Sequence, residues 1–522
     1  MLPLLLATSA TAVLSYVVLY RLYFHPLARY PGPWIGRATD WYTVYHSLKG
    51  DRYVDFVALH ARYGDIVRYG PNRLSFSTVD ALQAVYGTRA NTKKSYWYDT
   101  MTFYMQTAST HATTNKVQHA RKRRILAQAL SDRMLHVYED GFMKLLDGFV
   151  RRYEKPAAVT ENGWSAVFDM EHEFMLLNFD SMGDFCFGES FGSLQNPSKA
   201  DMIENSLEAF RGLNAIGHMP GLSWLQLDAL ASKVSRAIKE YEAYAAKLAN
   251  KCVEKFGQKI HNKEQLSCVF DILYATSSQP GVEGFTFQEL VSESSLLVTT
   301  GTDTTSGALA NALFNLLNNP ETMSRLTREI RDTFSDISEI RVGKPLNDCK
   351  YLAACIDETH RLTSIVGGCL MREVLPGGIT IDGHFIPRGV DVGVPYHVIM
   401  RSSKYHAAPW EYRPQRWLHS ETSAEEIRVA RSAYCAFGLG PTGCVGKTWA
   451  MMEMKLTLAQ LLFRVLELSH IQNHSISEVH GIDKDPDEWI RATPIFGLAY
   501  DFCLKLSGSV AYRRRVDSKV GL

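Results

Sequence analysis

A ten-residue stretch, 437–446, constrains the fold of this chain more than any other. It contains several glycines and a proline, a composition that excludes both a helix and a plain strand. Such a sequence forms a tight loop whose backbone can approach a flat ligand closely. A helical pattern at 447–466 follows directly, so we expect the loop to end at a helix N-terminus.

The one cysteine in this loop, Cys444, is a candidate metal ligand. A thiol at a helix N-terminus, surrounded by backbone N–H groups, is expected to have a pKa below its usual value of about 8.5. The resulting thiolate is a soft ligand for a metal ion. The alternative is a buried and inert cysteine, which we expect for the other eight, including Cys435.

The amino-terminal segment Leu2–Tyr20 contains no charged side chain. As a helix it spans about 28 Å, close to the thickness of the hydrocarbon core of a bilayer. Arg21, Arg29 and Arg37 follow it, so the positive-inside rule places the rest of the chain in the cytosol. A cleaved signal peptide is the alternative, but the segment lacks a basic start and a clear cleavage site. We expect residues 1–24 to be an uncleaved transmembrane anchor.

Composition and charge narrow the class of protein. The 522 residues include 56 lysines and arginines and 55 acidic residues, and 46% are hydrophobic. These values are typical of a globular protein with a large core, and they exclude a disordered tail, a collagen and a polytopic membrane protein. The net charge of +1 argues against a nucleic-acid binder driven by overall charge. Nine scattered cysteines indicate a reducing compartment rather than a disulfide-bonded fold.

The hydrophobic periodicity predicts a mainly α chain with minor β structure. One hairpin is expected over 64–78 and a second over 378–387, around an Asp-Gly turn. Two prolines around a glycine at 31–33 interrupt regular structure and predict a stiff, Pro-rich hinge over 25–40. Helices are expected at 120–153, 170–187, 202–212, 229–256, 286–318, 320–335, 348–364 and 447–466.

The pattern Phe-x-x-Gly-x-x-x-Cys-x-Gly over 437–446 resembles the heme-binding signature of the cytochrome P-450 monooxygenases. The resemblance implies the cytochrome P-450 fold and one heme b (iron protoporphyrin IX), with Cys444 as the proximal ligand of the iron. It also implies that Phe437 packs near the sulfur. Gly440 and Gly446 would then let the loop and the following helix approach the macrocycle.

A Thr-Gly-Thr-Asp-Thr-Thr motif at 300–305, inside the predicted helix 286–318, resembles the oxygen-binding groove of the same family. The missing side chain of Gly301 would leave room for a small polar ligand. The resemblance implies that Asp303 relays protons and that Thr304 forms a hydrogen bond in the oxygen pocket. Taken alone, the motif is also compatible with a simple helix kink, because threonines within helices often bond back to the backbone.

Cations for the heme propionates follow from the same resemblance. His119 and Arg123, four residues apart on one helical face, match a propionate-binding pair, and Arg372 matches another propionate-binding arginine. Thr442 stands where the family usually has an arginine, so one propionate contact is expected to be missing. We expect the basic run 119–124 to be solvated, with spare cations that attract an acidic redox partner.

A structural motif supports the resemblance. Glu358 and Arg361 lie at i and i+3 in the predicted helix 348–364, where their side chains can pair. In the family this pair is buried and joined by a later arginine, which Arg416 in the segment 412–417 matches. We expect these side chains to hold the heme side of the core rather than to take part in catalysis.

The chain has no glycine-rich dinucleotide or flavin fingerprint, so electrons must come from another protein. The resemblance implies a heme-thiolate monooxygenase of the fungal microsomal type, served by NADPH–cytochrome P-450 reductase and possibly by cytochrome b5. It would use O2 to hydroxylate or epoxidise a substrate in secondary metabolite biosynthesis. Aromatic and methionine side chains at 97–110, with Ile365, Val366 and the 493–496 turn, predict a pocket for a small apolar organic molecule.

Two other function classes remain open. One is a heme-thiolate isomerase or dehydratase that needs no reductase, and the other is a non-enzymatic heme carrier or sensor. Neither requires the Asp303–Thr304 pair. The resemblance runs to about residue 500, so we expect one large heme domain over 41–510, on the cytosolic side of the endoplasmic reticulum membrane. A basic tail at 511–522 would follow it.

Overall fold

The computed structural model describes residues 1–102, 107–154, 168–201, 232–262, 268–279 and 283–464, with Ser509–Val510 and isolated positions between these ranges. Several predicted features lie mostly or wholly outside the described residues: part of the 97–110 stretch, the 202–212 helix, the 493–496 turn and the 511–522 tail.

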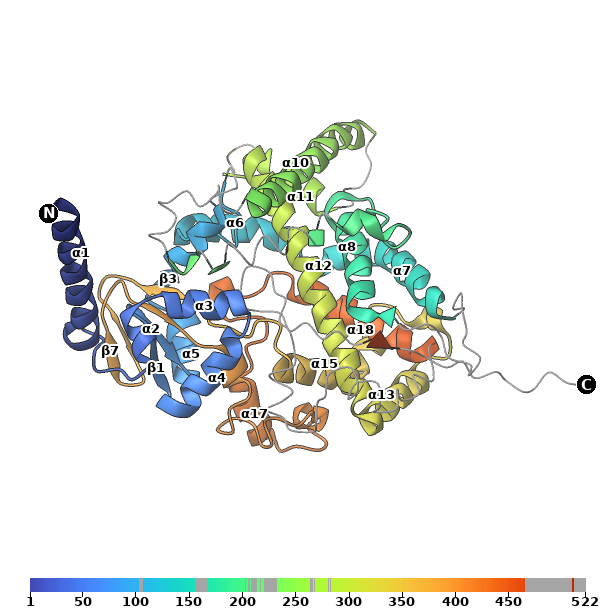
Figure 1. Cartoon of the computed structure of the whole chain (residues 1–522). Helices are drawn as coiled ribbons and strands as arrows, with labels where there is room; N and C mark the ends of the chain where they lie inside the picture. Colours follow the sequence, from blue (N-terminus) through green and yellow to red (C-terminus); the bar gives the residue numbers. More distant parts are fainter. Residues whose placement is uncertain are drawn as a thin grey trace, which may run out of the picture.

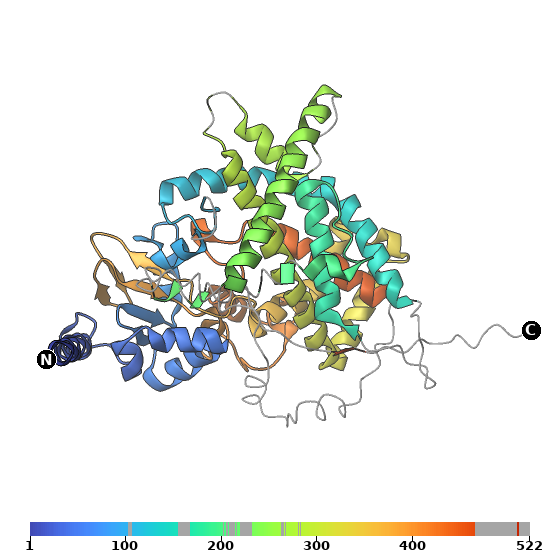
Figure 2. The ribbon, with the colours of Figure 1, turned by 45° about the horizontal axis from the view of Figure 1, so that its top comes forward.

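Helices make up most of the described chain, and they separate from the strands in space. Figures 1 and 2 show the sheet and the amino-terminal helices on one side of the molecule and the long helices on the other. The helices are α1 Leu2–Leu19, α2 Trp34–Ala38, α3 Trp41–Lys49, α4 Arg52–Tyr63, α5 Val79–Tyr86, α6 Lys116–Ala129, α7 Asp132–Glu154, α8 Met170–Phe187, α10 Ser232–His261, α11 Val269–Ser277, α12 Phe287–Leu317, α13 Pro320–Thr333, α14 Lys344–Asp348, α15 Lys350–Leu362, α16 Tyr396–Ile399, α17 Ala424–Ser432 and α18 Lys447–Arg464.

The predicted helices that the structure describes agree with these bounds within two residues, except for α10, which spans Ser232–His261 instead of 229–256, and for one predicted helix that is divided. The predicted helix 120–153 is in fact two helices, α6 and α7, with a break at Leu130–Ser131. The Ser131 carbonyl accepts a hydrogen bond from the Leu135 N–H at 3.2 Å, which starts the second helix. Serine followed by aspartate is a favoured helix start, because both side chains suit the unpaired N–H groups there.

Helix α12 is the centre of the helical part. It packs against α8, α10, α15 and α18, and most of its 31 residues are buried (Figure 1). Its start is defined by a capping box, in which the Thr286 side chain accepts from the Glu289 N–H and the Glu289 side chain accepts from the Thr286 N–H. A long helix buried on most sides can therefore carry side chains into the interior of the domain.

The main sheet has five strands in the order β1-β2-β8-β5-β3, with β2 and β8 parallel and the other pairs antiparallel. The predicted hairpin over 64–78 is present as β1 and β2, and the one over 378–387 as β6 and β7. In the second, Asp382 and Gly383 both have positive φ, as this hairpin turn requires. The strands are β1 Ile66–Gly70, β2 Arg73–Phe76, β3 Thr92–Lys94, β4 Phe168–Asp169, β5 Arg372–Val374, β6 Ile379–Ile381, β7 His384–Ile386, β8 Asp391–Gly393 and β9 Ser509–Val510.

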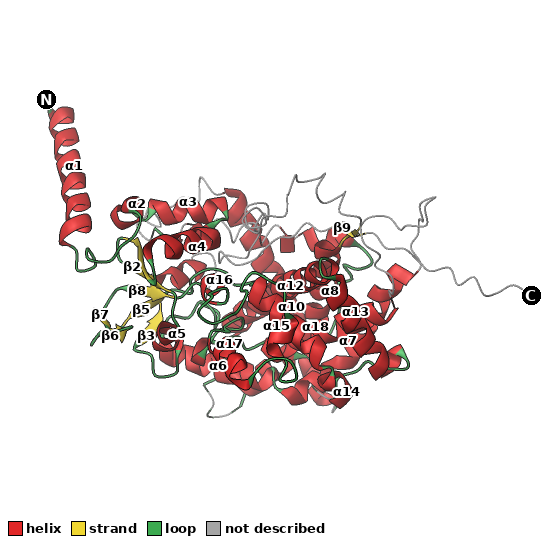
Figure 3. Cartoon of the chain, turned by 90° about the horizontal axis from the view of Figure 1, so that it is seen from below, coloured by secondary structure: helices red, strands yellow, loops and turns green. Residues whose placement is uncertain are grey.

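The amino-terminal helix stands away from the domain. Helix α1 continues into a π-helical turn, η1 (Tyr20–Phe24), and no residue from Leu2 to Phe24 is buried in the domain. Figure 3 shows α1 leaving the domain beside α2. A largely exposed and mostly apolar helix of this length is consistent with a membrane anchor.

Candidate functional site

The loop that contains Cys444 is closed by its own backbone. The Cys444 N–H donates to the Phe437 carbonyl at 2.7 Å, and the loop leads directly into α18. Gly440 has a φ of 60°, and a Cβ there would lie 2.2 Å from the Tyr86 carbonyl at the end of α5. Glycine is needed at 440 because only a residue without a side chain lets the loop approach α5 so closely. A Cβ at Gly446 would meet nothing nearer than the Cys444 Sγ at 4.0 Å.

The thiol of Cys444 differs from the other thiols. It is exposed, whereas every other cysteine that the structure describes is buried. Burial of the site within the protein nevertheless raises the pKa of Cys444, against the lowering effect of the Gly446 backbone N–H and the charges of Arg123 and Lys447. The prediction that the loop alone lowers this pKa is therefore wrong, and a coordinating cation would be needed to remove the proton.

The three predicted propionate-binding side chains converge near this loop. His119 and Arg123 lie on α6, and the charge of Arg123 acts on Cys444. Arg372 on β5 is buried and donates to the Tyr98 hydroxyl and to the Thr442 hydroxyl, both at 3.0 Å. Threonine at 442 thus gives Arg372 an acceptor at the position where a second arginine would have repelled it.

Lys94 on β3 belongs to the same group, although its sequence context did not indicate it. The Lys94 ammonium is buried and donates to the carbonyls of Thr110, at 2.9 Å, and His111, at 2.7 Å. Burial, followed by repulsion from Arg372, lowers the pKa of Lys94 well below its usual value. Strand alternation is the signal that could have found it, because Lys93 on the other face pairs with Glu373. We call four side chains the cation cluster: Lys94, His119, Arg123 and Arg372.

The cation cluster has no ion-pair partner among the described residues. Within that part of the chain, no carboxylate oxygen lies within 4.0 Å of the charged nitrogens of Lys94, Arg123 or Arg372. Burial, together with the charges of Lys94, Arg123 and Arg372, lowers the pKa of His119 to about 3. Cations that are buried or half-buried and lie near one another in this way are costly unless a negatively charged group joins them.

The basic run 119–124 is not the solvated patch that its composition predicts. Arg121 and Lys122 are buried, and both reach Glu289 on α12, at 2.6 Å and 3.0 Å. Arg124 alone remains exposed among the cations of this run. The expectation of several spare cations for a redox partner is therefore wrong, because the helical period turns most of the run toward the interior.

Asp303 and Thr304 lie in the middle of α12 and are half-buried, in a stretch where Thr302 and Thr305 are buried. The Thr304 hydroxyl donates to the Thr300 carbonyl at 2.6 Å, which is the backbone bond expected of a threonine within a helix. Helix α12 packs against α18, which begins just after Cys444. The partly open face of α12 and the Cys444 loop therefore belong to one region of the molecule.

The role predicted for Gly301 is different in the structure. A Cβ at Gly301 would lie 2.3 Å from the sulfur of Met182 on α8, so the space beside this glycine is filled. Gly301 lets α8 pack closely against α12 and does not widen a pocket. Farther along α12, a Cβ at Gly307 would lie 3.4 Å from the Cδ1 of Ile365, one of the residues predicted to line the substrate pocket.

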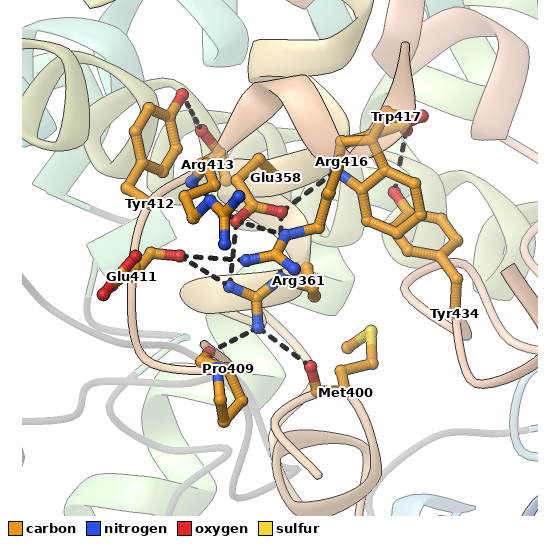
Figure 4. A network of polar contacts seen from close by, with 12 residues as sticks. Glu358, Arg361, Met400, Pro409, Glu411, Tyr412, Arg413, Arg416, Trp417 and Tyr434 are labelled. Carbon is orange, nitrogen blue, oxygen red and sulfur yellow. Dashed lines mark hydrogen bonds and ion pairs between the residues drawn. The ribbon is translucent and has the colours of Figure 1, made fainter. Parts of the chain in front are cut away.

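A buried ion-pair network on α15 confirms the structural motif (Figure 4). Both Glu358 and Arg361 are fully buried, and their paired N···O distances are 2.9 Å. Arg416 in the 3₁₀ turn Pro414–Trp417 donates to the same carboxylate at 2.9 Å, as predicted. The Trp417 indole N–H adds a further bond at 3.0 Å.

Backbone carbonyls satisfy the remaining guanidinium donors of this network. Two arginines surround one carboxylate, so one positive charge is left over. The remaining N–H groups of the two arginines donate to backbone carbonyl oxygens, as Figure 4 shows for Arg361. The accepting residues are Met400, Ala407, Ala408, Pro409 and Glu411. We call Glu358, Arg361, Arg416 and these carbonyls the Glu358 network.

The family model for cytochrome P450 matches residues 28–480 of the chain. The chain belongs to the cytochrome P450 family. The cytochrome P450 monooxygenase poxM of Penicillium oxalicum is 34% identical over 472 residues, which cover 88% of this chain and 90% of the relative. The monooxygenase atnE of Emericella nidulans is 35% identical, covering 85% and 86%. Averantin hydroxylase of Dothistroma septosporum is 31% identical, covering 85% and 81%.

This cytochrome P450 is thus a monooxygenase whose cofactor is heme, and the site fits that group. Heme carries two propionates, and the cation cluster is short of negative charge. Its iron needs a ligand, and Cys444 is the described cysteine with an exposed thiol. Cys444 could hold the iron, with the cation cluster at the propionates.

The predicted pocket stripe at 97–110 is only partly described. Trp97, Tyr98 and Met101 are buried, and the Trp97 indole N–H donates to the Asn214 carbonyl at 3.2 Å. Tyr98 bonds to Arg372, so this side chain belongs to the wall of the cation cluster. Sequence alone could not separate these roles, because aromatic residues serve both as core and as lining.

Proposed function

We propose that this cytochrome P450 hydroxylates or epoxidises a small apolar organic molecule in fungal secondary metabolite biosynthesis. It would be anchored in the endoplasmic reticulum membrane by α1 and take electrons from NADPH through a separate reductase, with cytochrome b5 as a possible further donor. The observation that carries the proposal is the exposed thiol of Cys444 beside a cation cluster that forms no ion pair with the carboxylates the structure describes.

The residues that hold the cofactor have distinct tasks. When bound, heme with a thiolate ligand supplies the activation of O2. Cys444 would ligate the iron, while Arg123, His119 and Arg372 orient the propionates by charge-assisted hydrogen bonds. Phe437 lies beside the loop, with its ring 5.0 Å from that of His360.

Asp303 and Thr304 would move protons toward the oxygen site. The half-buried carboxyl of Asp303 can exchange protons with water, and the adjacent hydroxyl of Thr304 can pass them on. While its own proton is bonded to the Thr300 carbonyl, the Thr304 oxygen still has lone pairs with which to accept a hydrogen bond. A proton-delivering pair on the open face of α12 supports a monooxygenase over an isomerase or a heme carrier.

Reconstitution tests the proposal. The full chain is co-expressed with NADPH–cytochrome P450 reductase, and microsomes are incubated with isotope-labelled O2 and an extract of cells lacking the chain. We expect NADPH-dependent incorporation of one labelled oxygen atom into an apolar metabolite. Incorporation without NADPH or reductase, or none into any metabolite from a correctly folded heme protein, would refute it.

A paired variant tests the proton path. Asp303→Asn should lower product formation about 100-fold, the usual range for losing an acid–base group, while NADPH consumption continues and forms hydrogen peroxide. Asp332→Asn, at an exposed position on α13, is the matched control and should leave both rates unchanged. Equal rates in the Asp303 variant and the control would remove Asp303 from the mechanism.

A further inference from the structure

One buried carboxyl group near the cation cluster has no role in the site described above. Glu293 lies on α12, and its side chain is fully buried. Its Oε1 accepts from the Thr110 N–H at 2.5 Å and from the Thr110 hydroxyl at 2.8 Å. Its Oε2 is also buried and has no hydrogen-bond partner among the described residues. A carboxyl group bonded at only one oxygen is costly to bury, so its position calls for an explanation.

The residue that holds Glu293 also holds a member of the cation cluster. The Thr110 carbonyl accepts from the Lys94 ammonium at 2.9 Å, and the next carbonyl, that of His111, accepts from the same ammonium at 2.7 Å. Thr110 therefore directs its N–H and hydroxyl groups toward α12 and its carbonyl toward β3. A single residue thus joins the carboxyl group of Glu293 to the ammonium group of Lys94.

This link fixes the direction of the Lys94 side chain. A lysine has a long and flexible stem, so its ammonium group is aimed only where fixed acceptors hold it. The two carbonyls take two of its three N–H donors, which leaves one donor for a negatively charged group. Because Glu293 holds Thr110 in place, it determines where the first of these acceptors lies.

The charge of Lys94 also depends on Glu293. Burial, followed by the charges of Arg372 on β5 and of Arg123 and Lys122 on α6, lowers the pKa of Lys94. The charge of Glu293 acts in the opposite direction. A buried ammonium group among other cations loses its proton readily, and a nearby carboxylate opposes that loss.

The other titratable groups around this pair define the pH range in which Glu293 acts. Burial raises the pKa of Glu293 to about 7, helped by the charge of Glu289 on the same helix and opposed by that of Lys122. Glu293 is therefore mostly protonated at pH 6 and mostly ionised at pH 8. His111 and His119 also face Lys94, but burial lowers the pKa of each far enough to keep both rings neutral over this range.

We propose that Glu293 is a positioning residue for the cation cluster: it fixes Thr110, whose carbonyl holds Lys94, and its negative charge keeps the Lys94 ammonium protonated. This rests on the proposed heme site, in which Lys94 would face a propionate. Glu293 acts through Thr110 and Lys94 and does not touch the cofactor. Lys94 thereby stays a cation above neutral pH, where the surrounding positive charges would otherwise remove its proton.

Heme transfer from the loaded full-length protein to apomyoglobin, measured at pH 6 and pH 8, tests the proposal. Glu293→Gln keeps an oxygen that can accept both Thr110 bonds and removes only the charge. At pH 6, where Glu293 is already protonated, the variant should release heme within about twofold of the unchanged rate. At pH 8 it should release heme about tenfold faster, because Lys94 then loses its proton.

Two further variants separate position from charge. Glu293→Leu removes the acceptor as well as the charge, so heme transfer should be faster at both pH values. Glu289→Gln is the matched control, since Glu289 lies one turn earlier on α12 and its lowered pKa keeps it ionised at both pH values. The control should change the transfer rate by the same factor at pH 6 and pH 8.

A double substitution tests whether the effect passes through Lys94. In a Lys94→Met background, Glu293→Gln should cause no further acceleration at pH 8, because the cation on which it acts is absent. Two results would overturn the proposal. One is a change in Glu293→Gln that is equal at both pH values, and the other is an equal acceleration with and without Lys94.

The reduction potential of the heme iron gives a readout that a purely structural role would not move. Loss of the Glu293 charge alone would raise the potential, whereas loss of the Lys94 charge, which belongs to the cation cluster, lowers it more. Glu293→Gln should therefore lower the potential at pH 8 and leave it unchanged at pH 6. A rise at pH 8 would show that Lys94 keeps its proton without Glu293, and the proposal would fail.

Failure of the proposed heme site looks different. Lys94→Met and Cys444→Ala would then both leave heme binding and heme transfer unchanged, which would refute the site and the role of Glu293 together. If the site is right and only the role of Glu293 is wrong, Lys94→Met still accelerates transfer, whereas Glu293→Gln does not.

Discussion

The Glu358 network and the cation cluster both bury arginines, but they neutralise them differently. In the network, Arg361 and Arg416 share the Glu358 carboxylate, and carbonyl oxygens accept the other donors. In the cluster, Arg372 meets two hydroxyl groups, and no described carboxylate lies within ion-pair distance. The first region is complete without a ligand, whereas the second gains its balancing charge only when a negatively charged group binds.

One fold thus contains two kinds of buried charge: the charges of the Glu358 network stabilise the core, and those of the cation cluster are suited to bind a ligand. Charges that are paired by the protein contribute to the rigidity of the core whether or not the cofactor is present. Charges that are neutralised only by a bound ligand reduce the stability of the empty protein. Binding of that ligand then raises the apparent stability of the protein. We therefore expect mutations in the two regions to act with different signs on the empty and the loaded protein.

The largest effect should come from Cys444→Ala. Loss of the only exposed thiol among the described cysteines removes the metal ligand, so the thiolate-type carbon monoxide spectrum and all turnover should disappear. The buried Cys435→Ala, in the same loop region, should keep both. A Cys444 variant that retained the thiolate-type spectrum would contradict the ligand assignment.

Glu358→Gln should have the next largest effect, and it should destabilise both the empty and the heme-loaded protein. It leaves Arg361 and Arg416 buried without a carboxylate, which costs about 3–5 kcal/mol of unfolding free energy. Urea unfolding of the empty and the heme-loaded protein measures it. The control is Glu421→Gln, which breaks an exposed pair with Arg325 and should cost less than about 1 kcal/mol. Similar losses in the two variants would show that the network does not hold the core.

Lys94→Met should affect the empty protein and the heme-loaded protein differently. Removing one buried cation relieves repulsion in the empty protein but also leaves the Thr110 and His111 carbonyls without this donor, so the two effects oppose each other and its stability should change little. The loaded protein loses an attractive charge, so heme transfer to apomyoglobin should become about tenfold faster, equivalent to about 1.4 kcal/mol. Lys93→Met, on the outer face of the same strand, should change neither quantity by a comparable amount. Slower heme loss from the Lys94 variant would refute the role of the cluster.

The last prediction concerns the pH dependence of stability. Burial raises the pKa of Glu293 on α12 from 4.5 to about 7. The folded protein then keeps a proton that the unfolded chain releases, so stability falls as pH rises from about 4.5 to about 7, by at most about 3 kcal/mol. Glu293→Gln should flatten this fall when urea unfolding is compared between pH 5 and pH 7.5.

A neighbouring glutamate provides the control for that measurement. The Thr286 N–H and the charges of Lys122 and Arg121 keep the pKa of Glu289 below its usual value, although burial opposes them. Its stabilising effect is complete above the unfolded value, so Glu289→Gln should lower stability equally at both pH values. A Glu293 variant with the same slope as the unchanged protein would contradict the raised pKa.

Local patterns were enough to predict most of the fold. The bounds of α8 coincide with the predicted 170–187, because a helix start at Asp169 and the glycine after Phe187 mark its ends. The break between α6 and α7 was missed, since both flanking segments keep the helical period. The Glu358 network was predicted completely in its charged members, because a fixed spacing and a short loop motif identify them.

Contacts between distant segments were not predictable in the same way. Gly301 was assigned to a pocket, but Met182, more than a hundred residues earlier, fills the space. Lys122 was expected in solvent, but Glu289 of α12 draws it inside. In each case the residue type indicated what chemistry the residue could perform. The surroundings that the residue faces, however, depended on which helix packs against it. Only tertiary structure supplies that information.

The Glu358 network precedes Cys444 in the chain, and this order affects how the site can form during synthesis. All of its members lie between residues 358 and 416, and Cys444 follows them in the chain. A ribosome therefore delivers the complete network before it delivers the thiol. Because chains fold from the amino-terminal end as they emerge, the support for the site can form before its metal ligand exists.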